Sequence, residues 1–168
     1  MNRQQILGMW DHFRQVHGVT LRALAKLPQD KLDSHPIQGM RTPKELVAHT
    51  YVYCKAIPAA VLKGRLTTED GTEPVDKIKT REDLLKYARD CFTSADASVK
   101  QITDAHLTGM VETFWGPTMP GFVMMSILPE EHLHHRGQLY AYLRTFGIEP
   151  PFMWGFEQNE PALQPQGA

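Results

Sequence analysis

Apolar residues recur at steps of three and four positions along four long segments of the chain, which is the spacing of one face of an α-helix. The segments cover residues 3–27, 43–63, 81 to about 104, and about 122–146. No long stretch alternates between apolar and polar residues in the manner of a half-buried strand. We therefore predict an all-α protein, a four-helix bundle with a longer irregular connection before its last helix.

Two of the predicted helices begin with capping residues. Thr42 is followed by Pro43, which suits the first helical position, and by Glu45, whose side chain can reach back to the cap. Thr80 is followed by Asp83 at the same relative position. These patterns predict that helices start directly after both threonines.

The segments between the helices differ in composition. Residues 64–79 hold turn formers and mixed charges, which predicts a surface connection, and residues 105–121 are rich in glycine and proline. We expect the second of these to be irregular, with a short extended piece near residues 111–114. One domain is predicted over residues 1–155, followed by a partly disordered tail, residues 156–168, that ends in Gln, Pro and Gly.

Length and composition indicate an ordinary globular protein. The chain has 168 residues, enough for one hydrophobic core, with 42% apolar and 22% charged residues. No apolar run reaches the roughly 18–20 residues of a membrane helix, and the start of the chain lacks the long apolar core of a signal peptide. We expect a cytoplasmic protein that does not contact membranes.

Charge and cysteine content indicate neither a nucleic-acid surface nor a cysteine metal site. The 18 basic and 19 acidic residues are interleaved without a basic block, so we expect no direct contact with nucleic acid. Cys54 and Cys91 lie inside helical segments and lack the CxxC spacing of metal knuckles. They are predicted to be reduced thiols of the core.

The candidate chemistry lies in the last helix, where three of the eight histidines follow a pair of glutamates. Glu131 and His135 are four positions apart, so they share a helix face at a spacing that allows two ligands to bind one ion. Leu128 and Leu139 flank the pair at further helical steps and predict that this face points into the bundle. Burying an unpaired carboxylate costs on the order of several kcal/mol, and a metal ion or a charge partner would offset that cost.

A third group comes from another helix. His49 lies on or beside the apolar stripe of the second helix, where on its own it is typical of a hydrogen-bonded core histidine. Together with Glu131 and His135 it predicts a metal site of the kind that helix bundles build in their cores. His132, three positions before His135, could chelate in place of Glu131. The whole cluster could also be a solvated polar face without metal.

The other histidines and aromatic residues carry weaker signals. His134 lies roughly 100 degrees around the helix from His135, so it is interpreted as a supporting or surface residue. His12 is a candidate pocket-wall residue. We expect His17, His35 and His106 to be solvated. Candidates for a pocket lining, or alternatively for core filling, are Trp10, Phe114, Trp115 and the methionines at 119, 124 and 125.

Two stretches resemble a known family. Residues 134–139, HHRGQL, followed by Gly147 and a proline pair at 150 and 151, resemble the end of the last long helix in DinB/YfiT-like proteins of the DinB superfamily. Residues 41–49, RTPKELVAH, look like the start of that family's second helix, which ends in its first metal-binding histidine. The resemblance extends over most of the chain, from the first helix to about residue 155.

The resemblance implies a four-helix bundle in an up-down-down-up arrangement, commonly a homodimer, with a divalent ion held by three protein groups. The ion is usually zinc or nickel. Characterised relatives are transferases that use the low-molecular-weight thiols bacillithiol, mycothiol or glutathione, or are related hydrolases and isomerases. His49 takes the first ligand position and His135 the last. Glu131 stands where the family usually has a histidine, a change that favours Mn or Fe(II) somewhat more than three imidazoles would.

These observations lead to two functional hypotheses. The first is a divalent-metal-dependent enzyme of the DinB-like superfamily that acts on a small-molecule substrate. Its reaction would be the transfer of a thiol to an electrophile in stress or detoxification, or a related metal-assisted hydrolysis, with Gln138 and Arg136 as supporting residues. The second is a dimeric bundle that binds a metal or small ligand without turnover.

Overall fold

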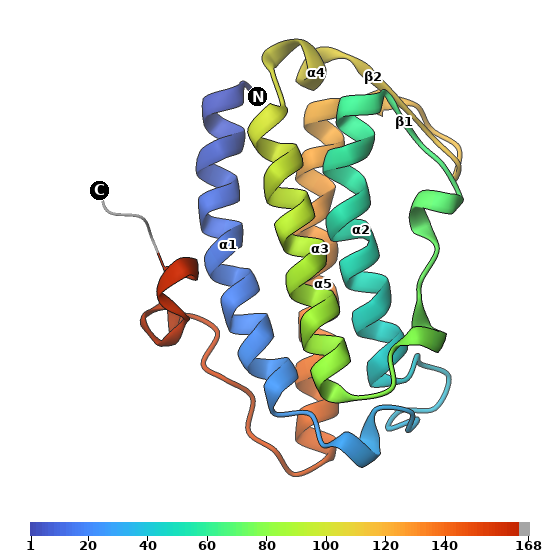
Figure 1. The fold of residues 1–168 in the computed structure, drawn as a ribbon, viewed down its shortest axis with the longest axis vertical. Helices are drawn as coiled ribbons and strands as arrows, with labels where there is room; N and C mark the ends of the chain where they lie inside the picture. The colour runs from blue at the N-terminus through green and yellow to red at the C-terminus, as the bar shows by residue number, and fades with distance from the viewer. Residues whose placement is uncertain (165–168) are drawn as a thin grey trace.

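Four long helices pack side by side in the computed structural model, which describes residues 1–164 (Figure 1). They are α1 (Arg3–Ala25), α2 (Pro43–Lys63), α3 (Arg81–Gln101) and α5 (Gly121–Thr145). Figure 1 shows that α2 and α3 run parallel to each other and opposite to α1 and α5, so a long connection must return from the end of α2 to the start of α3. The predicted four-helix bundle is confirmed, and its helix directions are those implied by the family resemblance.

The predicted helix starts are confirmed by their caps. The Thr42 hydroxyl accepts a hydrogen bond from the Glu45 amide at 3.2 Å, and the Glu45 carboxylate accepts one from the Thr42 amide at 2.8 Å. Thr80 and Asp83 form the same reciprocal pair, at 3.0 and 2.9 Å. α2 continues past Pro58 to its C-terminal cap, Gly64, which adopts a left-handed conformation with φ of 75°.

The connections contain short elements. Three small strands, β1 (Arg65–Leu66), β2 (Met110–Thr113) and β3 (Met119–Pro120), form one sheet in that order, with β1 parallel to β2 and β2 antiparallel to β3. The extended piece predicted near residues 111–114 is therefore the central strand of this sheet. The other short elements up to α5 are η1 (Gln29–Lys31), η2 (Glu69–Gly71), η3 (Val75–Lys77) and α4 (Asp104–Thr108).

The core contains polar groups as well as apolar ones. His17 on α1 has only 1% of its surface exposed, its Nδ1 lies 2.8 Å from the Tyr51 hydroxyl, and its ring stacks on Phe92 with 4.1 Å between centroids. The prediction that His17 is solvated is wrong, because it follows the buried Phe13 by one helical turn and so points the same way. Both cysteines are buried free thiols, as predicted.

Three further histidines lie at or near the surface. His12 is exposed and meets Phe156 edge-on, with 5.8 Å between ring centroids, so it is a surface residue and not a pocket wall. His35 is exposed as expected. His106 is half-buried, and its Nδ1 accepts a hydrogen bond from the Thr103 backbone amide at 3.1 Å in the cap of α4. No helix within residues 1–164 is long and apolar enough to cross a membrane.

The chain after α5 returns along α1 in two short turns, η4 (Phe156–Gln158) and η5 (Pro161–Leu163). Asn159 is 4% exposed, and its amide donates to the carbonyl of Gln15 at 3.0 Å. Arg22 donates to the carbonyl of Gly155 at 2.6 Å. The sequence predicted a partly disordered tail over residues 156–168. Residues 156–164 instead pack on α1 through these few anchors, and residues 165–168 lie outside the described part of the chain.

Replacing Gly18 by alanine is expected to detach this C-terminal segment from α1. A Cβ atom at Gly18 would lie 2.5 Å from the Asn159 side chain, which would have to leave its site and give up its hydrogen bonds. We expect a loss of about 1–3 kcal/mol in the free energy of unfolding, together with faster amide exchange over residues 155–164. Denaturant unfolding and hydrogen-exchange mass spectrometry measure the two effects.

Gly8→Ala is the matched control, because Gly8 lies on the same helix and a methyl group added there would have no neighbouring atom within 4 Å. Its higher helix propensity should stabilise the chain by roughly 0.5–1 kcal/mol. Equal exchange rates over the C-terminal segment in the two variants would show that Asn159 does not anchor it.

Candidate metal centre

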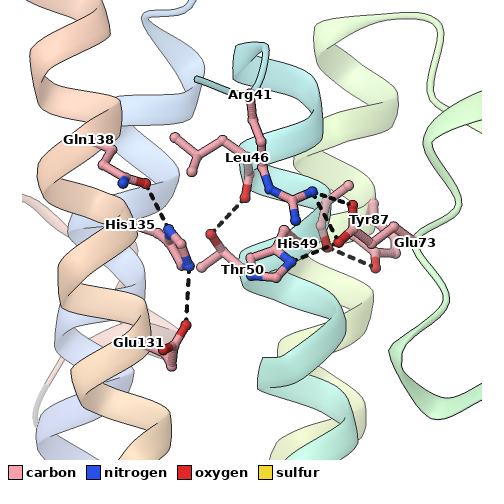
Figure 2. Close-up of polar contacts among 10 residues, drawn as sticks. Arg41, Leu46, His49, Thr50, Glu73, Tyr87, Glu131, His135 and Gln138 are labelled. Carbon is pink, nitrogen blue, oxygen red and sulfur yellow. Dashed lines mark hydrogen bonds and ion pairs between the residues drawn. The ribbon is translucent and has the colours of Figure 1, made fainter. Parts of the chain in front are cut away.

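The structure brings His49, Glu131 and His135 together between α2 and α5 (Figure 2). One ligand atom from each of the three side chains lies within 4.8 Å of the other two. His135 Nε2 is 3.1 Å from Glu131 Oε2, and the rings of His49 and His135 meet edge-on with 5.0 Å between centroids. The four-residue spacing on α5 thus aligns the carboxylate and imidazole, and α2 supplies the second imidazole from across the bundle.

Hydrogen bonds on the far side of each imidazole fix its orientation. His49 Nδ1 lies 2.7 Å from Glu73 Oε1, and His135 Nδ1 lies 2.8 Å from Gln138 Oε1 (Figure 2). Because both oxygens can only accept, each Nδ1 donates, and in the neutral ring each Nε2 presents a lone pair to the cluster. This is the arrangement in which proteins present histidines to metals, with a carboxylate or carbonyl behind the ligand.

Glu73 is the one residue of this arrangement that the sequence did not indicate. It lies in the connection between α2 and α3, where mixed charges are typical of any surface loop, so no local signal sets it apart. Arg41 pairs with the same carboxylate at 3.2 Å and holds it beside His49. Gln138, in contrast, was predicted as a supporting residue, and it lies directly behind His135.

Glu131 is less buried than the sequence predicted. Its side chain is 47% exposed, whereas that of His135 is 12% exposed. The reason is that His132 and Arg136 fill the core-facing positions between Leu128 and Leu139, which leaves Glu131 at the edge of the buried face. Desolvation of Glu131 therefore does not favour a metal, whereas the convergence of the three groups does.

His132, the alternative middle ligand, points elsewhere. It is 2% exposed, its Nε2 lies 2.9 Å from the Thr20 hydroxyl on α1, and its ring meets Phe13 and Tyr51 edge-on. Burial lowers the pKa of His132 to about 3, so it is a neutral core residue. Of the two candidates for the middle position, only Glu131 belongs to the cluster.

A cavity of about 330 Å³ opens beside the three groups. Its lining residues are His49, Tyr53, Ile57, Trp115, Ile127 and Glu131. Of the aromatic residues that the sequence suggests for a pocket lining, Trp115 lines this cavity. Phe114 packs against Trp115, with 5.1 Å between the two ring centroids. Trp10 is buried in the core instead, as are Met124 and Met125.

The sequence model of the DinB family matches residues 1–167 of the chain. The chain belongs to the DinB family. Among curated proteins, this DinB-family member is 23% identical over 144 residues to the uncharacterized protein YjoA of Bacillus subtilis (strain 168), covering 84% of the present chain and 91% of YjoA.

Two solved structures share the DinB fold of this protein. The DinB-like protein YjoA from Bacillus subtilis superposes with a TM-score of 0.72 at 24% identity, covering 89% of the present chain and 96% of YjoA. A DinB-like protein from Bacillus cereus ATCC 10987 superposes with a TM-score of 0.69 at 22% identity, covering 90% and 99% of the two chains. At these identities the likeness extends to the fold alone.

The donor set of this DinB-family protein fits a divalent ion. Two imidazoles and one carboxylate form a set that binds zinc in proteins and leaves coordination positions open. With Nδ1 protonated, the lone pair of His135 Nε2 faces the Glu131 carboxylate across 3.1 Å, and a second ring proton would join the two groups as an ion pair. A divalent ion would take the place of that proton and bind both groups.

Proposed function

We propose that this DinB-family protein is a divalent-metal-dependent enzyme whose ion is held by His49, Glu131 and His135. The reaction we propose is the transfer of a low-molecular-weight thiol to an electrophile, with metal-assisted hydrolysis as the close variant. The observation that carries the proposal is the convergence of three ligand atoms within 4.8 Å at the wall of a cavity of about 330 Å³. A metal site at a small-molecule cavity is typical of an enzyme.

The ion and the side chains around it would supply different parts of the chemistry. An ion held by three protein groups would supply Lewis acidity, which lowers the pKa of a thiol or water in an open position towards neutrality. Glu73 and Gln138 orient the two imidazoles. Burial raises the pKa of the Tyr53 hydroxyl, and the charge of Glu73 adds to the effect, so this cavity-lining group stays protonated and can donate a hydrogen bond to a substrate.

The donor set is compatible with several divalent ions. Zinc and nickel are the ions expected from the family resemblance, and both accept imidazole ligands. Glu131 lowers the net charge of the site by one relative to three histidines, which favours the harder ions Mn and Fe(II) more than an all-imidazole site would.

The proposal is tested by elemental analysis of protein purified without a histidine tag or chelator, followed by assays of thiol consumption with a panel of electrophiles. We expect about one divalent ion per chain and turnover that is lost when the ion is removed. An absence of metal, even after reconstitution with Zn, Ni, Mn and Fe(II), would overturn the proposal. One ion without turnover of any thiol or hydrolysable ester would leave a bundle that binds metal but does not catalyse.

Replacing Glu73 by alanine is expected to weaken zinc binding by at least about tenfold, because it removes the carboxylate that orients His49. Glu73→Gln keeps an acceptor and should lose less. Competition with a chelating dye measures the dissociation constants. Asp76→Ala, an exposed acidic residue of the same connection, is the control for loss of one negative charge. If the Asp76 and Glu73 variants bind zinc equally well, the hydrogen bond to His49 has no role in binding.

A further inference from the structure

We propose that the cavity beside the candidate centre binds an uncharged aromatic molecule, and that Trp115 determines this specificity. The bound molecule would be the electrophile of the proposed reaction, and this role rests on the proposed function. The binding of such a molecule to the cavity is independent of any ion.

The composition of the cavity wall gives the first argument. Four of the six lining residues are apolar or aromatic, namely Tyr53, Ile57, Trp115 and Ile127. The other two, His49 and Glu131, belong to the candidate centre. The volume of about 330 Å³ lies at the lower end of the range for small-molecule sites. The cavity thus suits a compact molecule with an apolar body and one polar group directed at His49 and Glu131.

The charges around the cavity give the second argument. No lysine or arginine occurs among the lining residues that the structure describes. Arg41, the nearby cation, is paired with Glu73 behind His49. A carboxylate or phosphate on the body of a ligand would therefore lie against apolar walls without a partner, which is unfavourable because a charge loses its hydration there. The cavity should reject anions that do not place their charge at the centre itself.

Trp115 is placed where a bound aromatic molecule would contact it. It lies on the turn between β2 and β3, and its ring meets that of Tyr53 edge-on with 6.1 Å between centroids. The Tyr53 ring in turn meets the His49 ring with 5.0 Å between centroids, so a series of aromatic rings leads from Trp115 to the candidate centre. Trp115 remains 42% exposed, which leaves part of a large apolar surface uncovered beside a cavity.

The turn that carries Trp115 is held in place by its own hydrogen bonds. Gly116 donates to the carbonyl of Thr113 at 3.3 Å and has φ of 128°, a conformation that favours glycine. The Thr113 hydroxyl donates to the carbonyl of Pro117 at 2.8 Å. The backbone that carries the indole is therefore held in place, and the ring itself contacts Tyr53 and Phe114, which lowers the entropic cost of binding a ligand.

The test compares two probes with the same ring system, uncharged 2-naphthylmethanol and anionic 2-naphthoate, by isothermal titration calorimetry. Chelator is present so that naphthoate cannot bind through a metal. We expect the alcohol to bind at least tenfold more tightly than the carboxylate. Trp115→Ala should weaken binding of the alcohol by about tenfold or more, and Trp115→Phe should restore part of it. Trp154→Ala is the control, since Trp154 is also exposed but does not line the cavity.

Metal content, measured on the same preparations, separates the two proposals. Binding of the alcohol that depends on Trp115 in a chain that takes up no metal would support the cavity specificity and overturn the proposed enzyme. A chain that takes up one ion but binds both probes equally, or binds the alcohol as well in Trp115→Ala as in the parent, would overturn the cavity specificity alone.

Discussion

Replacing His135 by alanine is expected to abolish stoichiometric binding of a divalent ion. His135 supplies one of only three ligand atoms in the cluster and lies beside a second, Glu131, so its loss leaves two groups on different helices. An ion present at about 100 times its dissociation constant stabilises the folded chain by roughly 2.7 kcal/mol. For a domain of this size that corresponds to a shift of about 5–10 °C in Tm. The variant should lose this shift on addition of ZnCl₂.

The neighbouring histidine provides the control. His134→Ala removes an imidazole from the same turn of α5, but His134 is exposed and is not one of the three converging groups. Its Nε2 lies 3.2 Å from the Gln138 amide nitrogen, and its ring meets that of His135 edge-on with 4.9 Å between centroids. This variant should keep both its ion and its thermal shift. Retention of one ion per chain by His135→Ala, or equal loss in both variants, would contradict the ligand set. Elemental analysis and thermal unfolding with and without chelator provide the two measurements.

The parts of the fold that could be predicted are those encoded locally. Apolar spacing and the two threonine caps determine the long helices, because each signal acts within one or two helical turns. The small sheet could be anticipated only in part. Its strands have two to four residues, and β1 pairs with β2 across more than forty positions, as in Arg65 with Glu112. Such pairing has no periodicity to detect.

The candidate site likewise combines a local sequence signal with contacts that only the folded chain creates. The spacing of Glu131 and His135 is a local signal, and it correctly placed their side chains side by side. The position of His49 depends on how α2 packs against α5, so its place beside the apolar stripe made it only a candidate third ligand, and the resemblance to the family implied the same residue as the first ligand. Glu73 could not have been found, because a loop glutamate has no fixed relation to a helix face. Its role emerges only from its 2.7 Å contact with His49.

The errors about polar residues of the core share one physical origin. Apolar residues alone define the periodicity, so polar residues on the same stripe are assigned to solvent or to the site. His17 and His132 lie on buried stripes and satisfy one ring nitrogen each, with Tyr51 and Thr20. The stripe of α5 therefore passes through His132 and Arg136, and Glu131 lies beside it. A polar residue at a core position is a candidate for a buried hydrogen bond before it is a candidate for solvent.

Acidification is expected to destabilise the chain through His17. Burial lowers the pKa of His17 well below its ordinary value, and His132, when it is itself protonated, and the charges of Arg89 and Arg14 act in the same direction. The unfolded chain takes up a proton at this position below about pH 6.5, whereas the folded chain does not, so stability falls as the pH falls. The limiting slope for one such group is about 1.4 kcal/mol per pH unit.

Denaturant unfolding at a series of pH values, with chelator present to exclude metal binding, measures this slope. His17→Gln is the informative comparison, because an amide can keep the hydrogen bond to the Tyr51 hydroxyl but cannot titrate. The variant's stability is offset by a constant amount, whereas its slope below pH 6.5 should be smaller than that of the parent by about 1.4 kcal/mol per pH unit. Parallel curves for the two proteins would mean that His17 is protonated in the folded chain, and the stacking of its ring on Phe92 would then be a cation–π contact inside the core.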